Sequence, residues 1–491
     1  MTIATVLPVL ILMLPAAGVA VMFAAPFRPA KRIASAALAI GTALVLVAAV
    51  QLYLTGQALR HDVGGWAPPL GISLRIDGTS VALLLMTALV LCLVALSTGP
   101  AFRSARPEGD ARIPFTFWAL LLAVWAALNL VFMAQDLFTL FVALELLTFA
   151  AVPLACLAGT ADSLRAALRY LLVTLAGSVL YLLGVAVLYG RYGALDLAVL
   201  AERMQADWPS LLALALMIGG LTIKTALFPF HLWLPPAHAG APAPASAILS
   251  ALVIKAPFFI ILRLWFELLP GVQSAAGVLL ASLGAASILI CSLIALQQAR
   301  LKLLVAYSTV AQVGYLFLIF ALATGPDVRA GLAWSGAMLQ LASHAFAKAA
   351  MFLAAGRIAE ALGHDRIDDL AGAYRRAPVS VLAFSLAALS LIGLPPSGGF
   401  NAKAMLLSVA VAQGHWWIAF TILLGGLLAG AYLFRVIGRA IAPPPPGMPL
   451  DRTHRRSEAG ALCLAGGALL LGLVPLQAIP LLAVAMPGAF P

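Results

Sequence analysis

The chain alternates between long apolar segments and short polar, glycine-rich or proline-rich stretches. An α-helix needs about 20 mostly apolar residues to cross a bilayer. About fourteen segments meet or approach that length, so the pattern predicts an all-α polytopic membrane protein. The predicted helices cover residues 4–24, 33–54, 79–99, 113–133, 137–158, 168–190, 210–230, 243–264, 272–296, 303–324, 330–355, 379–410, 415–437 and 459–484.

Composition supports this prediction and excludes several other classes. The 491 residues are 63% hydrophobic and 10% charged, whereas an ordinary soluble domain has about 25% charged residues. A soluble enzyme, a disordered tail, a coiled coil and a collagen-like fibre are therefore excluded. The four cysteines each stand alone in an apolar stretch without CxxC spacing. We therefore expect no metal site and no cofactor, such as an iron–sulfur cluster or haem, in this chain.

The net charge of +11 would point to nucleic acid in a soluble protein, but here the basic residues are better explained as loop residues. Nineteen lysines and arginines lie in the odd-numbered predicted loops and five in the even-numbered ones. Because cytoplasmic loops carry an excess of Lys and Arg, we expect the odd loops in the cytoplasm and both termini on the opposite side. The first segment lacks a basic start and is too long for a signal peptide, so it is predicted to be a retained span. The expected location is the bacterial inner membrane, without a nucleic-acid partner.

A few charged residues do not fit into loops. Arg263 lies near a helix end and can extend its charge to the surface, but four lysines and one glutamate lie within apolar runs: Lys224, Lys255, Lys348, Lys403 and Glu145. Each central lysine costs about 2.5–3.5 kcal/mol to insert. Such groups face protein or internal water and commonly mark an ion or proton path; the alternative is that they are hydrogen-bonded contacts between helices. Burial disfavours a charged lysine and a nearby carboxylate favours it, so the proton affinity of such a lysine depends on whether an acid stands beside it.

Two of the lysines accompany predicted helix breaks. Lys224 precedes Pro229, Pro235 and Pro236, and Lys403 follows Pro395 and Pro396. Proline removes an amide donor and frees a carbonyl one turn back, and such backbone is tolerated at membrane depth only inside protein or beside water. Two interrupted helices about 180 residues apart indicate repeated halves with a site at their interface. Independent proline kinks in a helical bundle are the alternative.

Three histidines extend the candidate set. His344 and Lys348 are four residues apart and share a helix face, which favours a proton relay over a hydrogen-bonded core histidine. His231 follows Lys224 by seven residues, and His238 follows the break. Both are predicted to line a mouth or to take part in the relay.

Several motifs together resemble a known family. They are LPPAH with an upstream Lys and Pro-Phe-His, ILSALVIKAPFFIILR, ARLKLLVAYSTVAQVGYL, SHAFAKAAMFLAAG and LPPSGGFNAK. In this order they are similar to the antiporter-like, proton-translocating subunits of respiratory complex I (NADH-quinone oxidoreductase), of Mrp-type Na+/H+ antiporters and of membrane-bound hydrogenases. The resemblance covers roughly residues 75–440. Pro236 stands where the family often has an acid, which leaves the parent complex open more than the transport core.

The resemblance implies fourteen helices with two inverted five-helix repeats and a hydrated axis of charged residues. The expected units are residues 1–112, 113–268 (first repeat), 269–440 (second repeat) and 441–491. The family's helix-five glutamate falls on Glu145, its first broken-helix lysine on Lys224, and its helix-eight lysine on Lys255. Its second broken-helix residue, a lysine or a glutamate, falls on Lys403. Its helix-eleven His/Lys pair falls on His344 and Lys348.

The expected function is proton translocation as a membrane subunit of a complex I-like or related complex. Two alternatives stay open: a subunit of an Mrp-type Na+(K+)/H+ antiporter without redox activity, and a membrane scaffold that transports nothing. Expected partners are other membrane subunits and protons, with Na+ or K+ as further candidates. No redox chemistry is expected in this chain, so any oxidoreductase activity would belong to partner chains.

Overall fold

The structure, a computed structural model, describes residues 3–24, 29–98, 112–268, 273–323, 328–444 and 458–474. The first helices are α1 (Ile3–Ala24), α2 (Ala30–Thr55), α3 (Gly78–Ser97), α4 (Arg112–Met133), α5 (Leu137–Ala155), α6 (Ala161–Tyr192), α7 (Leu197–Arg203) and α8 (Trp208–Lys224). Then follow α9 (Leu234–Gly240), α10 (Ala243–Ile248), α11 (Lys255–Leu268), α12 (Gln273–Leu296), α13 (Leu301–Phe317) and α14 (Ile319–Leu322). The chain continues with α15 (Val328–Leu362), α16 (Ala373–Arg376), α17 (Pro378–Ile392), α18 (Gly398–Ala412), α19 (Trp416–Ala440) and α20 (Ala459–Leu473).

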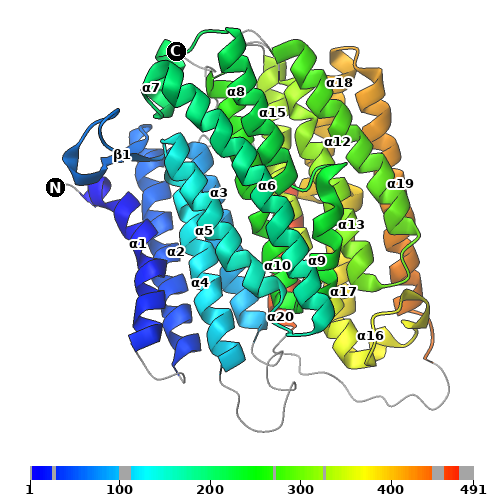
Figure 1. Cartoon of the computed structure of the whole chain (residues 1–491). Coiled ribbons are helices and arrows are strands. Elements are labelled where there is room, and N and C mark those ends of the chain that lie inside the picture. Colours follow the sequence, from blue (N-terminus) through cyan, green and yellow to red (C-terminus); the bar gives the residue numbers. More distant parts are fainter. Residues whose placement is uncertain are drawn as a thin grey trace.

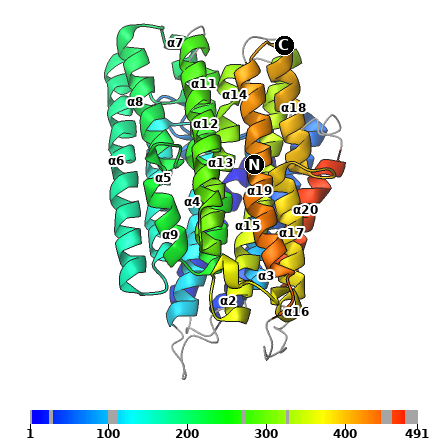
Figure 2. The ribbon, with the colours of Figure 1, turned by 90° about the vertical axis from the view of Figure 1, so that its right-hand side faces the viewer.

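The long helices form one bundle in which their axes are roughly aligned (Figures 1 and 2). The N-terminal helices stand at one side of Figure 1, and α18 and α19 stand at the other. Within the described residues, eleven helical segments are long and apolar enough to cross a membrane, and four shorter apolar helices (α8, α17, α18 and α20) accompany them. At 1.5 Å per residue, a 20-residue helix matches the roughly 30 Å hydrocarbon core. The chain is therefore a multi-pass membrane protein, as predicted.

Glycine lets neighbouring helices approach closely in both halves of the bundle. A Cβ added at Gly177 on α6 would lie 2.6 Å from the carbonyl oxygen of Gly220 on α8. A Cβ added at Gly284 on α12 would lie 2.6 Å from the carbonyl oxygen of Gly314 on α13. Small residues at such crossings are typical of membrane helices, which associate mainly through van der Waals packing. These two tight pairs fix α8 against α6 and α13 against α12.

Several predicted continuous helices are shorter than expected or interrupted in the structure. The predicted helix 210–230 ends at Lys224, and the segment after it forms a short 3-10 turn (Phe230–Trp233) and then α9. The predicted run 379–410 is divided into α17 and α18, as its prolines indicated. The run 243–264 contains a π-helical turn (Leu249–Val253) between α10 and α11. Of the last predicted helix, residues 475–484 lie outside the described ranges.

The sequence analysis missed a short hairpin and one surface helix. Strands β1 (Leu59–Asp62) and β2 (Ser73–Ile76) pair antiparallel, with Leu59 opposite Ile76. Isolated bridges join Leu74 to Ala134 and Asp136 to Asp196. The hairpin therefore lies over the start of α5, at the same end of the bundle as α7 (Figure 1).

Candidate functional site: a row of buried lysines

Lys224 forms an ion pair with the mid-span glutamate. Its Nζ lies 3.0 Å from Glu145 Oε1 on α5 and 3.1 Å from Thr148 Oγ1, one turn further along the same helix. Ser178 on α6 donates a second hydrogen bond to Glu145 Oε1. The Lys224 side chain is 5% exposed and that of Glu145 16%. Glu145 and Lys224, both predicted from their charge within apolar runs, are therefore brought together by three helices.

The position of Lys224 follows from the end of α8. Lys224 is the last residue of that helix, Ala226 takes a left-handed φ of 58°, and Pro229 has no amide proton to offer the preceding turn. The C-terminal end of a helix carries partial negative charge, which adds to the attraction of Glu145 for the ammonium group. The indole of Trp233, from the segment after the break, donates to the Ile223 carbonyl at 3.0 Å. The break therefore places the lysine at a helix end inside the bundle.

A small cavity connects Lys224 with the next lysine-bearing segment. It measures about 20 Å³ and is lined by both threonines near the ion pair, by Lys224 and by residues on either side of Lys255: Leu144, Leu147, Thr148, Tyr170, Thr174, Lys224, Val253 and Pro257. A polar cavity of about 10–15 Å³ or more has room for one water molecule. The space is therefore large enough for a single bridging water between the two lysine regions.

Lys255 lies at the junction of the π-turn and α11. Its Nζ donates to the Ser250 carbonyl at 2.6 Å, and the Ser250 hydroxyl pairs with Thr309 Oγ1 at 2.8 Å. A π-turn shifts the helical hydrogen-bond pattern and is often found at functional sites. Here it leaves a carbonyl for the ammonium group of Lys255, which is 1% exposed.

Lys348 is held by α13. Its Nζ donates to Val305 O at 3.0 Å and to Ser308 Oγ at 2.7 Å, and Tyr432 on α19 donates to the same hydroxyl at 2.9 Å. His344, one turn earlier on α15, is 1% exposed, and within the described structure neither of its ring nitrogens has a hydrogen-bond partner. Buried polar atoms without partners are rare and call for a functional or solvent explanation.

His344 is the group that links the lysines electrostatically. It interacts with the charges of Lys255, Lys348 and Lys403. His238 interacts with two of these lysines, Lys255 and Lys348. The predicted His344/Lys348 pair therefore lies between the first and the second helix break.

Lys403 occupies the second break, and the two prolines create its binding site. Its Nζ donates to Leu391 O at 2.5 Å and to Ile392 O at 3.2 Å. In a continuous helix, these carbonyls would accept from the residues four positions later, which are Pro395 and Pro396 and have no amide proton. The prolines thus free the two carbonyls that hold the ammonium group.

The remaining predicted histidines occupy different surroundings. His238 is fully buried, stacks on Phe352 with ring centroids 4.6 Å apart, and interacts electrostatically with Lys255, Lys302 and Lys348. His231 is 3% exposed and lies between the rings of Phe228 and Tyr307, with centroids at 5.5 and 6.2 Å. His238 is thus placed near the central lysines, whereas His231 stays close to the first break.

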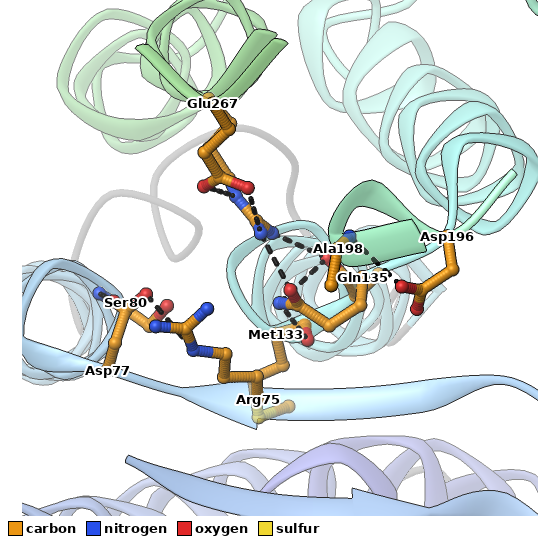
Figure 3. Close-up of polar contacts among 10 residues, drawn as sticks. Arg75, Asp77, Ser80, Met133, Gln135, Asp196, Ala198 and Glu267 are labelled. Carbon is orange, nitrogen blue, oxygen red and sulfur yellow. Dashed lines mark hydrogen bonds and ion pairs between the residues drawn. The ribbon is translucent and has the colours of Figure 1, made fainter. Parts of the chain in front are cut away.

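Arg263 does not extend to the surface as the sequence suggested. It is 5% exposed and pairs with Glu267 at 2.9 Å, while also donating to the carbonyl of Ala134 at 2.8 Å and to Gln135 Oε1 at 2.7 Å. The Arg263 guanidinium donates both to Gln135 Oε1 and to Glu267 Oε2. Figure 3 shows these two acceptor side chains pointing toward one another, beside the ion pair between Arg75 on β2 and Asp77. Arg263 therefore belongs to a closed polar cluster at one end of the first half.

The sequence analysis missed the neutral residues around the lysines. Four contact a lysine directly: Thr148, Ser250 (through its carbonyl), Ser308 and Tyr315. Four more bond the groups that hold a lysine: Ser178, Thr309, Gln312 and Tyr432. Within the described part of the chain, no group of three or more His, Cys, Asp or Glu side chains is placed to hold a metal ion. The four cysteines are free.

These observations define a class: a multi-pass helical membrane protein with two helix breaks, each bearing a lysine, and further lysines between them. A family model described as NADH:quinone oxidoreductase/Mrp antiporter, transmembrane, matches residues 134–429. The chain belongs to this family.

Individual relatives extend the similarity over nearly the whole chain. NADH-quinone oxidoreductase subunit N of Desulforudis audaxviator is 34% identical, with 96% of this chain and 97% of that protein aligned. A Na(+)/H(+) antiporter subunit of Alkalihalophilus pseudofirmus is 29% identical over 92% of this chain and 88% of its own length. A chain in the structure of the Mrp complex from Dietzia sp. DQ12-45-1b superposes with a TM-score of 0.89 at 25% identity, covering 99% of this chain and 97% of that one. The chain is thus similar to subunits of two kinds of assembly, an NADH-quinone oxidoreductase and a Na(+)/H(+) antiporter.

Proposed function

We propose that this chain is a proton-translocating membrane subunit of a multi-subunit complex and that Glu145, Lys224, Lys255, His344, Lys348 and Lys403 carry the proton. The observation that supports this most strongly is the uneven distribution of charge along the lysine row. Lys224 bonds a carboxylate, whereas the ammonium groups of the other three donate to backbone carbonyls or, for Lys348, also to a hydroxyl. One acid at one end of the row gives the proton path a single point of control.

In this proposal, the ionised Glu145 keeps a proton on Lys224. Movement of the carboxylate away from Lys224, or its neutralisation by a partner subunit, removes the attraction that compensates for burial. The Lys224 ammonium then gives its proton to a neutral Lys255 through water, for which the 20 Å³ cavity lined by Lys224 and by Val253 and Pro257, the chain neighbours of Lys255, has room. Lys224 becomes a neutral amine and Lys255 becomes charged.

The next transfers use the groups between the breaks. His344 accepts a proton on one ring nitrogen and releases one from the other, as histidine relays do near neutral pH. Its electrostatic interactions with Lys255, Lys348 and Lys403 support a role as the shared neighbour. Lys403 is the last group of the row. His231, close to the first break, and the fully buried His238, near the central lysines, are candidates for further relay groups.

The orientation follows from the loop charges. With the odd-numbered loops in the cytoplasm, both termini lie on the non-cytoplasmic side of a bacterial inner membrane. Electron transfer, where the parent complex performs it, takes place on partner chains that drive this one.

The test is proton movement into inside-out membrane vesicles that contain the assembled complex. Glu145→Gln and Lys224→Met are each expected to lower the rate at least tenfold, or about 1.4 kcal/mol or more in barrier height. Asp207→Asn is the matched control, because it removes another acid from an ion pair, the exposed Arg191–Asp207 pair at 2.7 Å. Wild-type rates in both site variants, at equal amounts of complex, would rule out the proposed path.

A second candidate is a subunit of an Mrp-type Na+(K+)/H+ antiporter without redox activity. The close superposition on a chain of the Mrp complex favours it. One observation argues against a complete Na+ site within this chain. Na+ prefers negatively charged oxygen ligands, and Glu145 is the one mid-span acid in the sequence. Na+-dependent proton exchange in vesicles without any electron donor would support this candidate over a redox-driven one.

A further inference from the structure

Lys403 is a buried cation whose bound groups include no acid within the described residues. Its ammonium group is 4.4 Å from the centroid of the Tyr315 ring and otherwise donates to the Leu391 and Ile392 carbonyls. An aromatic face attracts a cation through its negative quadrupole, most strongly where water is excluded. The ring therefore stands where Lys224 has a carboxylate.

The position of the Tyr315 ring is fixed by its neighbours. Tyr315 is 1% exposed, and its hydroxyl donates to the Ile422 carbonyl on α19 at 3.4 Å. A Cβ added at Gly425 on α19 would lie 2.4 Å from that hydroxyl, so glycine leaves the space that the phenol needs. A Cβ added at Gly393, which has a φ of 90°, would lie 2.9 Å from Lys403 Cδ. Two glycines thus make room for the lysine and for the ring that it contacts.

Few titratable groups surround this pair. His344 on α15 interacts electrostatically with Lys403, and Lys348 lies one turn further along α15. Cys291 lies on α12, which packs against α13 and α19, and α20 contains Cys463. Helices α14 and α17 contain no titratable residue. On α19, Tyr432 donates to Ser308, and two arginines lie near the C-terminal end of the helix. Tyr315 is therefore the side chain best placed to compensate for the charge of Lys403.

We propose that Tyr315 is a positioning residue for proton transfer: its ring face holds the Lys403 ammonium group against the carbonyls freed by the helix break, in place of a carboxylate. This inference rests on the proposed function, because it assumes that Lys403 loses and regains a proton during transport. A polarisable ring holds the cation more weakly than a full negative charge does. It suits a group that must release its proton in every cycle.

The test compares Tyr315→Phe, which keeps the ring, with Tyr315→Leu, which removes it, in the assembled complex. Proton movement in vesicles is measured against pH. Loss of the ring face disfavours charged Lys403, so the pH of half-maximal transport in Tyr315→Leu is expected to fall by about one unit, the size of a desolvated cation–π contact. Tyr315→Phe is expected to keep the wild-type dependence of transport on pH. The proposal would be overturned if Tyr315→Leu had the same pH profile of transport as the wild type. It would also be overturned if Tyr315→Phe shifted that profile as much as Tyr315→Leu does.

Two controls separate this role from packing and from the wider proposal. Tyr181→Leu removes another fully buried tyrosine whose hydroxyl donates to a backbone carbonyl at 3.1 Å, and it should leave the profile in place. An equal shift in Tyr181→Leu would contradict a specific role for Tyr315.

Lys403→Met distinguishes failure of the proposed function from failure of the role of Tyr315. If Lys403→Met transports normally, the proposed function fails. If it is inactive and Tyr315→Leu is normal, only the role of Tyr315 fails. Should Tyr315→Leu not assemble, phenylalanines of increasing fluorination at position 315 keep the shape and weaken the ring face. A graded shift is then expected, and its absence would contradict the proposal.

Discussion

The two helix breaks solve the same physical problem in different ways. At the first break, Lys224 is stabilised by a carboxylate from another helix, 3.0 Å away. At the second, Lys403 is stabilised by two carbonyls of the preceding helix, the closer at 2.5 Å, and by an aromatic ring. A carboxylate side chain can rotate away or take up a proton, whereas a backbone carbonyl can do neither. In the proposed mechanism, this difference gives control to the first break and makes the second a fixed proton-holding site.

The largest effect is expected from leaving Lys224 without its acid. Removal of one partner from a buried ion pair costs up to about 3–5 kcal/mol while the remaining group stays charged, and less once a lysine gives up its proton, as the proposed transfer requires. Glu145→Leu should therefore lower the stability of the chain by at most that amount in thermal unfolding of the purified complex. The double variant Glu145→Leu/Lys224→Met should recover most of the loss, since it buries no charge. A double variant as unstable as the single one would contradict the ion-pair explanation.

The second prediction makes the second break resemble the first. Gln312 on α13 donates to the same Leu391 carbonyl as Lys403, at 3.0 Å. Gln312→Glu places an acid beside the lysine, so the charged lysine is held more tightly and proton movement should slow by about tenfold or more. Gln413→Glu is the control, since Gln413 donates to a different backbone carbonyl at 2.9 Å, at the end of α18. Unchanged rates in Gln312→Glu would show that the absence of an acid at this break does not matter.

The third prediction concerns the space around Lys403. Gly393→Ala combines a left-handed backbone with a Cβ 2.9 Å from the lysine, so stability should fall by about 1–2 kcal/mol and transport should fall as well. Gly414→Ala, at a φ of 75° with nothing within 4 Å of the added Cβ, should affect stability alone. Denaturation and vesicle assays on both variants separate the two effects. Normal transport in Gly393→Ala would argue against a tightly fitted lysine site.

The smallest effect is expected at the hydroxyl that supports Glu145. Ser178→Ala removes one hydrogen bond to a charged group, which is worth about 1.5–3 kcal/mol in the interior and less where the acid is partly exposed. Because Glu145 is partly exposed, we expect a loss of about 1 kcal/mol or less and a modest change in transport rate. Ser282→Ala, which removes a hydroxyl bonded only to its own helix at 2.7 Å, is the comparison variant for the unfolding measurement. A larger loss in the comparison variant would mean that Ser178 does not hold the acid.

Charged residues and prolines were predictable from the sequence because they are costly in a membrane. Lys224, Lys255, Lys348 and Lys403 are visible in the apolar background, and the prolines predicted the breaks that the structure contains. The neutral partners gave no such signal. Hydroxyl residues are tolerated in apolar helices because they can bond a carbonyl of their own helix, as Thr174 does with Tyr170 at 2.8 Å. Their spacing alone does not reveal which of them face a lysine.

Other features depended on long-range pairing. The π-turn before Lys255 has the composition of an ordinary helix. Two of the partners of Arg263, Ala134 and Gln135, lie about 130 positions away in the chain. Strands β1 and β2 have only four residues each, too few to give a recognisable alternating pattern between the long apolar segments. Fourteen helices and two inverted repeats stay predictions of the sequence analysis.

The most direct test of the control assigned to the first break is infrared difference spectroscopy on vesicles during proton movement. The account predicts a change in a carboxylate band that is present in the wild type, absent in Glu145→Gln and kept in Asp207→Asn. Such a change would report that the Glu145–Lys224 pair opens or that the acid is neutralised in each cycle. Steady proton movement with no Glu145-dependent change in the carboxylate region would contradict the account.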